Sequence, residues 1–219
     1  MEFVPDTIFR LFLHLFARVL PFAVFIALLA AQSLAGSDNA WLTVGRGLGV
    51  AVLLAFLWPR YVELRGQRSP AKEWIIAVAV GLTVFVAWIH LDHPWLAFSS
   101  GRGFDPKGDW LLTALRLATL ALVVPVMEEL FWRSFLLRRI DSPEFLAMDP
   151  RRASWRAFAL SSALFASEHS LWFAGLLAGV AYAWMYRRTG NLWIPIVSHS
   201  VTNGTLGLWI LATGNWRYW

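Results

Sequence analysis

Residues 110–137, WLLTALRLATLALVVPVMEELFWRSFLL, decide how this chain folds. The stretch is longer than the roughly 20 apolar residues that cross a bilayer, and near its end it carries two adjacent glutamates and an arginine. Ionisable side chains in hydrocarbon are costly, and where they occur they usually face a protein interior and mark function. The stretch therefore predicts a membrane helix that holds a functional site at Glu128, Glu129 and Arg133.

The whole chain has the composition of a membrane protein. Of its 219 residues, 58% are hydrophobic and 15% are charged, against roughly 25% charged in soluble domains. No segment is polar enough to form a soluble domain, so residues 1–219 are predicted to be one all-α integral membrane domain. The absence of cysteine excludes disulfides, thiolate metal sites and a cysteine nucleophile. The net charge of +5 lies in short clusters between apolar runs, which suits lipid headgroups and argues against a nucleic-acid partner.

Apolar segments predict a polytopic helical bundle of about seven spans, with six to eight as the range because the fifth and sixth segments are short. The segments are residues 8–31, 41–58, 74–91, 110–137, 154–168, 171–186 and 192–212.

Basic residues alternate between the connections. Eleven lysines and arginines fall in 59–73, 138–156 and 187–190, and only three fall in the other connections and the tail after 212. Positive charge is enriched in cytoplasmic loops, so we expect the N-terminus inside and the C-terminus outside. Tryptophans mark the proposed span edges at positions 41, 58, 74, 110, 155 and 193. Residues 33–36 resemble a signal-peptidase site, but acidic residues precede the run, and we expect no cleavage.

Polar groups from three spans are expected to meet near the middle of the bilayer. At about 1.5 Å of rise per residue, Glu128 lies roughly 15 Å, His169 roughly 20 Å and His199 roughly 16 Å from the basic residues that mark the cytoplasmic edge. Asn203 lies on the same helix face as His199, four residues later. This convergence is what a buried site requires.

The positions of the two glutamates on the helix predict different roles for them. Glu129 and Arg133 are four residues apart in the acid-first order that favours an ion pair. Glu128 is turned by about 100° from Glu129, so it can face a cavity instead. Pro125 and Pro195 each remove a helix hydrogen bond near the polar groups, which could open a hollow beside them.

Two further features have structural interpretations. Ala174-Gly175 and Ala178-Gly179 form a small-residue face, which predicts a close helix contact. Arg46 and Arg116 lie within spans, and we interpret them as buried counter-charges or as side chains that extend toward the headgroups.

Three ordered motifs resemble a known family. Glu128-Glu129-x-x-x-Arg133, Phe165-x-x-x-His169 and His199-x-x-x-Asn203 look like the motifs of the CPBP (CAAX protease and bacteriocin-processing, or Abi) intramembrane proteases, which include the CAAX prenyl endoproteases. The resemblance covers about residues 110–212, which are predicted to be the catalytic core.

A longer similarity points to one bacterial branch of that family. VPVMEELFWRSFLLRRI (124–140) and TGNWRYW (213–219) are similar to the CAAX prenyl protease-related proteins that accompany exosortase systems. The resemblance implies a bacterial inner-membrane protein whose substrates carry C-terminal sorting signals. Two positions depart from the pattern: Ser134 stands where glycine is usual, and Glu168 precedes the motif histidine. Neither departure removes a catalytic group.

The resemblance implies a role for each motif residue, and general chemistry is compatible with these roles. Glu128 would be the base that activates water, and His169 would orient that water and pass the proton to the leaving amine. His199 and Asn203 would donate hydrogen bonds to the oxyanion. The Glu129–Arg133 pair would be structural. The resemblance favours a glutamic-type mechanism that requires no metal or other cofactor.

Several alternatives stay open. Glu128, His169 and His199 could bind zinc with a water as the fourth ligand, although the H-E-x-x-H signature is missing. Intramembrane glutamates and histidines also form proton relays in transporters and channels, but no matched pair of motif-bearing halves is present. A non-catalytic immunity or assembly partner would use the same residues structurally. The interpretation we adopt is an endopeptidase that cleaves membrane-associated substrates near their C-terminus.

Overall fold

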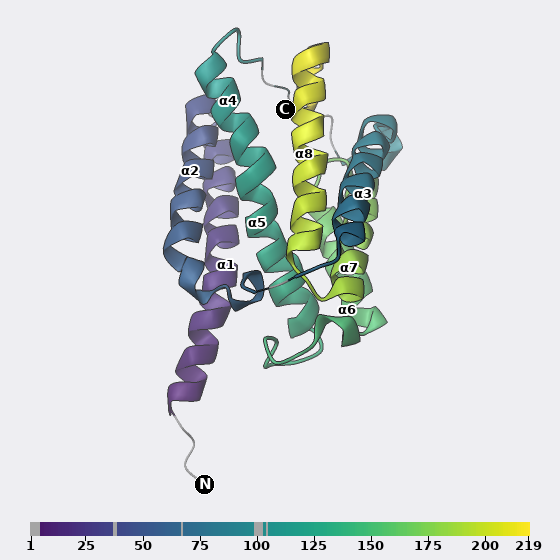
Figure 1. Ribbon diagram of the computed structural model, residues 1–219. Coiled ribbons are helices and arrows are strands. Elements are labelled where there is room, and N and C mark those ends of the chain that lie inside the picture. The colour runs from purple at the N-terminus through teal and green to yellow at the C-terminus, as the bar shows by residue number, and fades with distance from the viewer. Residues whose placement is uncertain (1–4, 37–38, 67, 99–102, 104) are drawn as a thin grey trace.

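The computed structural model describes residues 5–36, 39–66, 68–98, 103 and 105–219, and this part of the chain contains helices and no β-strand. Seven helical rods lie within it (Figure 1). They are α1 (Pro5–Leu34), α2 (Ala40–Leu57), α3 (Ala71–His90), a continuous rod over 110–137, α6 (Trp155–Ser167), α7 (Trp172–Thr189) and α8 (Trp193–Thr213). The prediction of an all-α bundle is confirmed, and each predicted apolar segment overlaps one rod.

Within the described residues, four helical stretches are long and apolar enough to cross a membrane. They are Leu11–Leu34, Ala40–Arg60, Ala71–His90 and Trp110–Leu137. The other rods do not meet this test: α6 has only 13 residues, and α8 carries the polar residues His199 and Asn203. The residues that make α8 chemically interesting are therefore the same ones that weaken its membrane signal.

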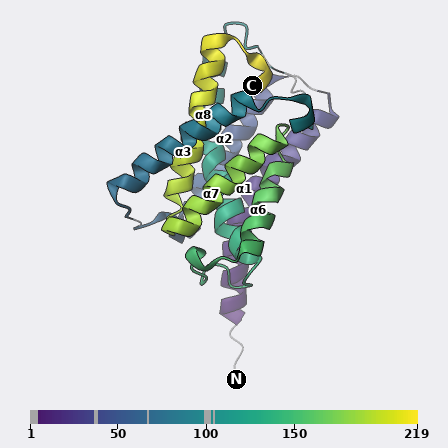
Figure 2. The same ribbon diagram turned by 90° about the vertical axis from the view of Figure 1, so that its right-hand side faces the viewer.

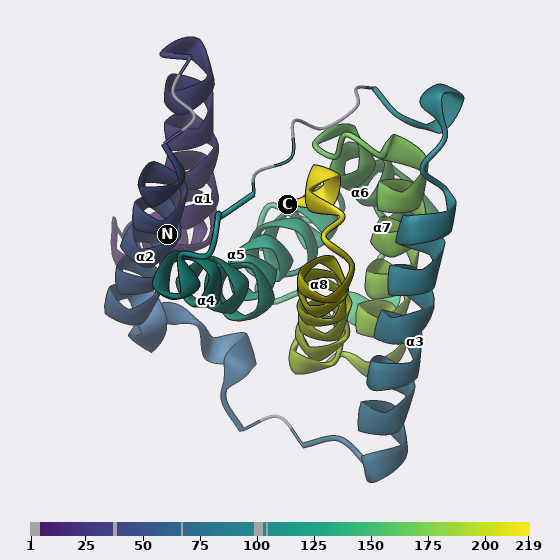
Figure 3. The same ribbon diagram turned by 90° about the horizontal axis from the view of Figure 1, so that it is seen from above.

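The rods form two groups that meet at the centre of the molecule. Viewed from above, α1, α2 and α4 (Trp110–Ala118) lie on one side, and α3, α6, α7 and α8 lie on the other (Figure 3). The later part of the central rod, α5 (Val124–Glu129), lies between the groups. The most extensive helix contacts join α3 to α8 and α6 to α7, and α3 crosses the molecule obliquely in the side view (Figure 2).

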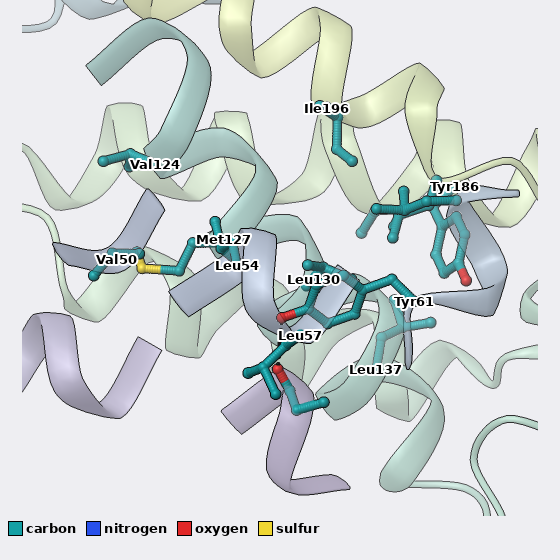
Figure 4. Packing of buried hydrophobic residues seen from close by; sticks show 14 of the residues in the cluster. Val50, Leu54, Leu57, Tyr61, Val124, Met127, Leu130, Leu137, Tyr186 and Ile196 are labelled. Atoms are coloured by element: carbon teal, nitrogen blue, oxygen red, sulfur yellow. Dashed lines mark hydrogen bonds between the residues drawn. The ribbon is translucent and has the colours of Figure 1, made fainter. Parts of the chain in front are cut away.

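The central rod is interrupted by two π-helical segments. Thr119–Val123 (η4) precedes α5, and Leu130–Leu137 (η5) follows it. The main apolar core surrounds this rod, with side chains from α2, α5, η5, α7 and α8 packed together (Figure 4). A π-helical segment often lies at a functional site. Two of them flank the glutamates here.

Glycines allow the close contacts that the small-residue face predicts. A Cβ atom at Gly179 would lie 2.9 Å from the backbone oxygen of Ser162 in α6, and one at Gly175 would lie 3.1 Å from the Cβ of His169. Only glycine lets α7 approach α6 this closely. The predicted helix contact is confirmed.

A buried charge cluster joins α1 to the central rod at the end opposite α4. Arg18, which is fully buried, donates from Nε to the carboxylate of Glu63 at 2.8 Å and from Nη1 to the His14 carbonyl at 2.7 Å. Arg138 approaches the same carboxylate at 3.7 Å. Ser134 also donates to Glu63. Ser134, which stands where the resemblance leads one to expect glycine, therefore contributes a hydrogen bond to this cluster.

Glu63 lies just beyond the α2 span, in the short 3₁₀ segment η2 (Val62–Leu64). Burial acts to raise the pKa of Glu63, but hydrogen bonds from Arg18 and Ser134 and the charge of Arg18 together hold that pKa below its usual range. A depressed carboxyl pKa stabilises the fold above the pKa of the unfolded chain. That stabilisation is lost as pH falls through the lower pKa of the folded state.

We expect Glu63→Gln to lower the free energy of unfolding by about 3–5 kcal/mol, because two buried guanidinium groups lose their counter-charge. Thermal unfolding of detergent-purified protein measures this loss. Glu144→Gln, at an exposed carboxylate, is the matched control. The difference between the two variants should shrink as pH falls and Glu63 becomes protonated in the parent. Equal melting temperatures at neutral pH would contradict a structural role for the cluster.

Candidate active site

Near Glu128, the central rod departs from the regular α-helical pattern of hydrogen bonds. The Val124 N–H donates to the Thr119 carbonyl five residues back, as a π-helix requires. The next donor in that pattern would be residue 125, but Pro125 has no N–H. The carbonyl of Leu120 therefore lacks its helical partner, and Nδ2 of Asn203 donates to it at 3.0 Å. The loss of a helix hydrogen bond predicted at Pro125 is therefore compensated by Asn203, a motif residue on α8.

Glu129 is the hub of the polar network. Its fully buried carboxylate contacts Nε of Arg133 at 3.1 Å and Nδ1 of His199 at 3.0 Å. The predicted Glu129–Arg133 ion pair is present. Arg133 also lies over the Phe165 ring at 4.3 Å and donates to the Gly179 carbonyl at 3.3 Å. The pair therefore connects the central rod to α6, α7 and α8.

The bond to Glu129 orients the His199 ring. A carboxylate accepts hydrogen bonds, so the hydrogen is assigned to Nδ1 and Nε2 is turned toward Glu128, whose Oε2 lies 3.9 Å away. Tyr182 stacks on the other side of the imidazole with ring centroids 4.8 Å apart. The Tyr182 hydroxyl donates to Thr202, which in turn donates to the Gly81 carbonyl. The hydrogen bond to Glu129 at the ring edge and the Tyr182 ring stacked on its face together fix the orientation of the imidazole.

Glu128 is separate from this ion pair, as its position on the helix predicts. It is 7% exposed, and its Oε2 has no hydrogen-bond partner among the described residues. A buried carboxylate oxygen without a partner is energetically costly unless a water or substrate group fills the position. Glu128 is therefore placed to interact with whatever enters the cavity that it lines.

His169 lies in the turn between α6 and α7, just after the last residue of α6, Ser167. Its Nδ1 lies 2.8 Å from the Phe165 carbonyl. A carbonyl can only accept, so the hydrogen is on Nδ1 and Nε2 keeps its lone pair. The rings of Phe165 and Trp88 flank the imidazole at 4.6 and 5.4 Å between centroids. The Phe165-x-x-x-His169 spacing thus supplies both the backbone acceptor and one packing surface.

One cavity brings the predicted site residues together. It has a volume of about 270 Å³, and Glu128, His169, His199 and Asn203 all line it. These residues come from the central rod, the α6–α7 turn and α8, so the predicted convergence of polar groups is present. Aromatic side chains form much of the remaining wall, including Trp88, Tyr182 and Trp219. The mostly apolar lining and few polar groups are typical of a ligand cavity.

A metal ion would meet a different set of ligands from the one that the sequence suggests. Ligand atoms of Glu128, Glu168 and His169 lie within 4.8 Å of one another. His199 is outside this group of described residues, although its Nε2 lies 3.9 Å from Oε2 of Glu128. The Trp132 indole holds Glu168 in place through a 2.9 Å hydrogen bond. The unusual glutamate before the motif histidine thus adds a third carboxylate to the site.

Several wall residues were missed by sequence reasoning. Tyr182 lies on α7, where the small-residue pattern predicts a packing contact and gives no sign of a site residue. Thr202 lies one residue before Asn203 and three after His199, and that spacing alone could have placed it beside the site. The segment after α8 also covers part of the cavity: Tyr218 donates to Asp92 at 2.7 Å, and Trp219 lines the wall. Because 126 positions along the chain separate Tyr218 from Asp92, no local sequence pattern predicts their contact.

Comparison with protein-family models gives one match. Residues 109–205 match the family described as Type II CAAX prenyl endopeptidase Rce1-like. The matched segment starts one residue before α4, ends within α8 and contains all the motif residues. Helices α1 to α3 lie outside it. Comparisons with curated proteins and with solved structures give no match.

We expect Asn203→Leu to lower the free energy of unfolding by about 1–3 kcal/mol, because the Leu120 carbonyl loses its donor. The cost should be smaller in a Pro125→Ala background, where an N–H is restored at the position that the π-helical pattern assigns to this carbonyl. A double-mutant cycle of unfolding free energies measures the coupling. Strictly additive costs would show that the proline and the asparagine act independently.

Proposed function

We propose that this chain, a protease of the CAAX prenyl endopeptidase type by its family match, is a glutamic-type intramembrane endopeptidase that cuts membrane-associated proteins near their C-terminus. The observation that supports this proposal most directly is the cavity that joins a buried carboxylate without a hydrogen-bond partner to two histidines and an asparagine. The apolar walls suit a substrate that arrives from the bilayer.

Glu128 is the general base in this mechanism. Its Oε2 is available to accept a proton from water because no side chain occupies it. General-base catalysis contributes roughly 10²- to 10⁴-fold to a rate. His169 receives and passes on the proton: Nδ1–H is held by the Phe165 carbonyl, so Nε2 is the nitrogen that accepts a proton and delivers it to the leaving amine.

His199 and Asn203 stabilise the tetrahedral intermediate. With one hydrogen on Nδ1, His199 can donate from Nε2 only when it carries a second proton, and the Glu129 carboxylate stabilises that charged form. Asn203 uses one N–H for the Leu120 carbonyl and has a second for the oxyanion. Glu129, paired with Arg133, orients His199 and takes no part in proton transfer.

The proposal includes a cellular location and a class of substrate. The distribution of basic residues supports an inner-membrane protein with its N-terminus in the cytoplasm. Similarity to the exosortase-associated branch supports substrates with C-terminal sorting signals over prenylated CAAX peptides. A non-catalytic role in immunity or assembly is the main alternative, and activity of a Glu128 variant separates the two.

Glu128→Gln should reduce cleavage by at least about 10²-fold, because the amide keeps the shape of the side chain and cannot act as a base. The measurement is cleavage of co-expressed membrane proteins that carry C-terminal sorting signals, with a prenylated CAAX peptide as a second substrate. Membrane abundance of each variant is checked. Glu144→Gln, on an exposed loop, is the control. Equal cleavage by the parent and Glu128→Gln would refute the base assignment, and a cellular function that survives the substitution without cleavage would favour the non-catalytic partner.

A zinc-dependent mechanism is a second candidate because three potential ligands cluster at Glu128, Glu168 and His169. These residues would hold the ion, which would activate the water in place of the free carboxylate. In the metal-free mechanism, chelators leave cleavage unchanged and Glu168→Gln costs less than about tenfold, because Glu168 is held by the Trp132 indole and transfers no proton. Loss of cleavage with a chelator and recovery with added zinc would support the metal mechanism instead.

A further inference from the structure

A hollow between α1 and α2 lies away from the active-site cavity. Its volume is about 460 Å³, and it is lined by three residues of α1, four residues of α2 and Ala35 in the connection between them. Most of the lining is apolar, and several of these side chains are well exposed, including Leu28 at 47% and Leu42 at 50%. Both helices are candidate membrane spans, so the hollow opens toward lipid.

Arg46 places a positive charge in this apolar hollow. It lies six residues after the first residue of α2, which is about 9 Å along the helix axis. Its Nη1 donates to Gln32 at 3.0 Å, and its guanidinium lies over the Phe25 ring at 4.7 Å. Its Nε is buried with no hydrogen-bond partner. No described carboxylate forms an ion pair with Arg46.

A second arginine strengthens the positive potential at this end of the bundle. Arg116 of α4 lies within electrostatic range of Arg46, and α2 packs against both α4 and η4. Arg116 also lies six residues after the start of its helix's predicted span, so the two charges are at similar depth. Like charges at membrane depth repel, and an anion near them would lower that repulsion.

We propose that the hollow binds a glycerophospholipid, with the phosphate on Arg46 and an acyl chain along the apolar walls of α1 and α2. Only a ligand that combines an anionic head with a long apolar chain matches both parts of the site. The depth fits as well, because an arginine about two turns inside a span can extend its head toward the phosphate layer. The free Nε of Arg46 and its Nη2 supply the paired donors that phosphate oxygens favour.

Native mass spectrometry of the full chain in detergent tests this proposal without reference to proteolysis. The probes are phosphatidylglycerol, a diacylglycerol with the same chains, and inorganic phosphate. We expect phosphatidylglycerol to bind at least tenfold more tightly than diacylglycerol and to resist displacement by inorganic phosphate. Equal binding of the two lipids would overturn the role of the phosphate, and displacement by inorganic phosphate would identify a simple anion site.

Two variants separate the charge from the hollow. Arg46→Gln should weaken phosphatidylglycerol binding about tenfold or more and remove the preference over diacylglycerol. Gly45→Leu keeps the charge and fills the hollow, since a Cβ at Gly45 meets nothing within 4 Å. It should weaken binding of both lipids. Arg65→Gln, an exposed arginine beyond the other end of α2, controls for net charge. Unchanged lipid binding in either Arg46→Gln or Gly45→Leu would overturn the proposal.

Discussion

The carboxylate of Glu129 is the point on which the arrangement of the site depends. It is fully buried and is shared between Arg133 of the same rod and His199 of α8. A buried carboxylate needs compensation from both charge and hydrogen bonds, and loss of one partner leaves an uncompensated charge that costs several kcal/mol. The shared contact therefore holds α8 in one rotation against the central rod. In that rotation, His199 Nε2 and Asn203 face the same cavity as Glu128.

The irregular backbone of the central rod is the second requirement. In a bilayer, a carbonyl released from a helix must find a donor within the protein. Pro125 and the preceding π-helical segment release the Leu120 carbonyl, and Asn203 satisfies it. One residue thus completes the helix and lines the cavity. The same principle applies to Ser134 in the second π-helical segment, whose carbonyl accepts a 2.6 Å hydrogen bond from Nε of Arg138.

Much of the fold and part of the site could be predicted because they depend on distances along the chain. Apolar runs of span length form helices, since in lipid a helix satisfies its own backbone groups. Four-residue spacing predicts the Glu129–Arg133 pair, and a turn of about 100° separates Glu128 from it. The small-residue face of α7 predicts a close contact with another helix. None of these conclusions needs to know which helices are neighbours.

The sequence by itself determined the helices, their order, and which polar residues share a face. The tertiary structure alone decided which further residues join them and which charges pair elsewhere: Glu168 joins Glu128 and His169, Tyr182 stacks on His199, and Arg18 pairs with Glu63 across 45 residues. Arg18 lies within the predicted first span, but its spacing to Glu63 along the chain gives no sign that the two pair. The physical reason is that a membrane helix is apolar on most sides, so its hydrophobic pattern does not specify its rotation or its neighbours. Close packing and the pairing of buried charges make that choice.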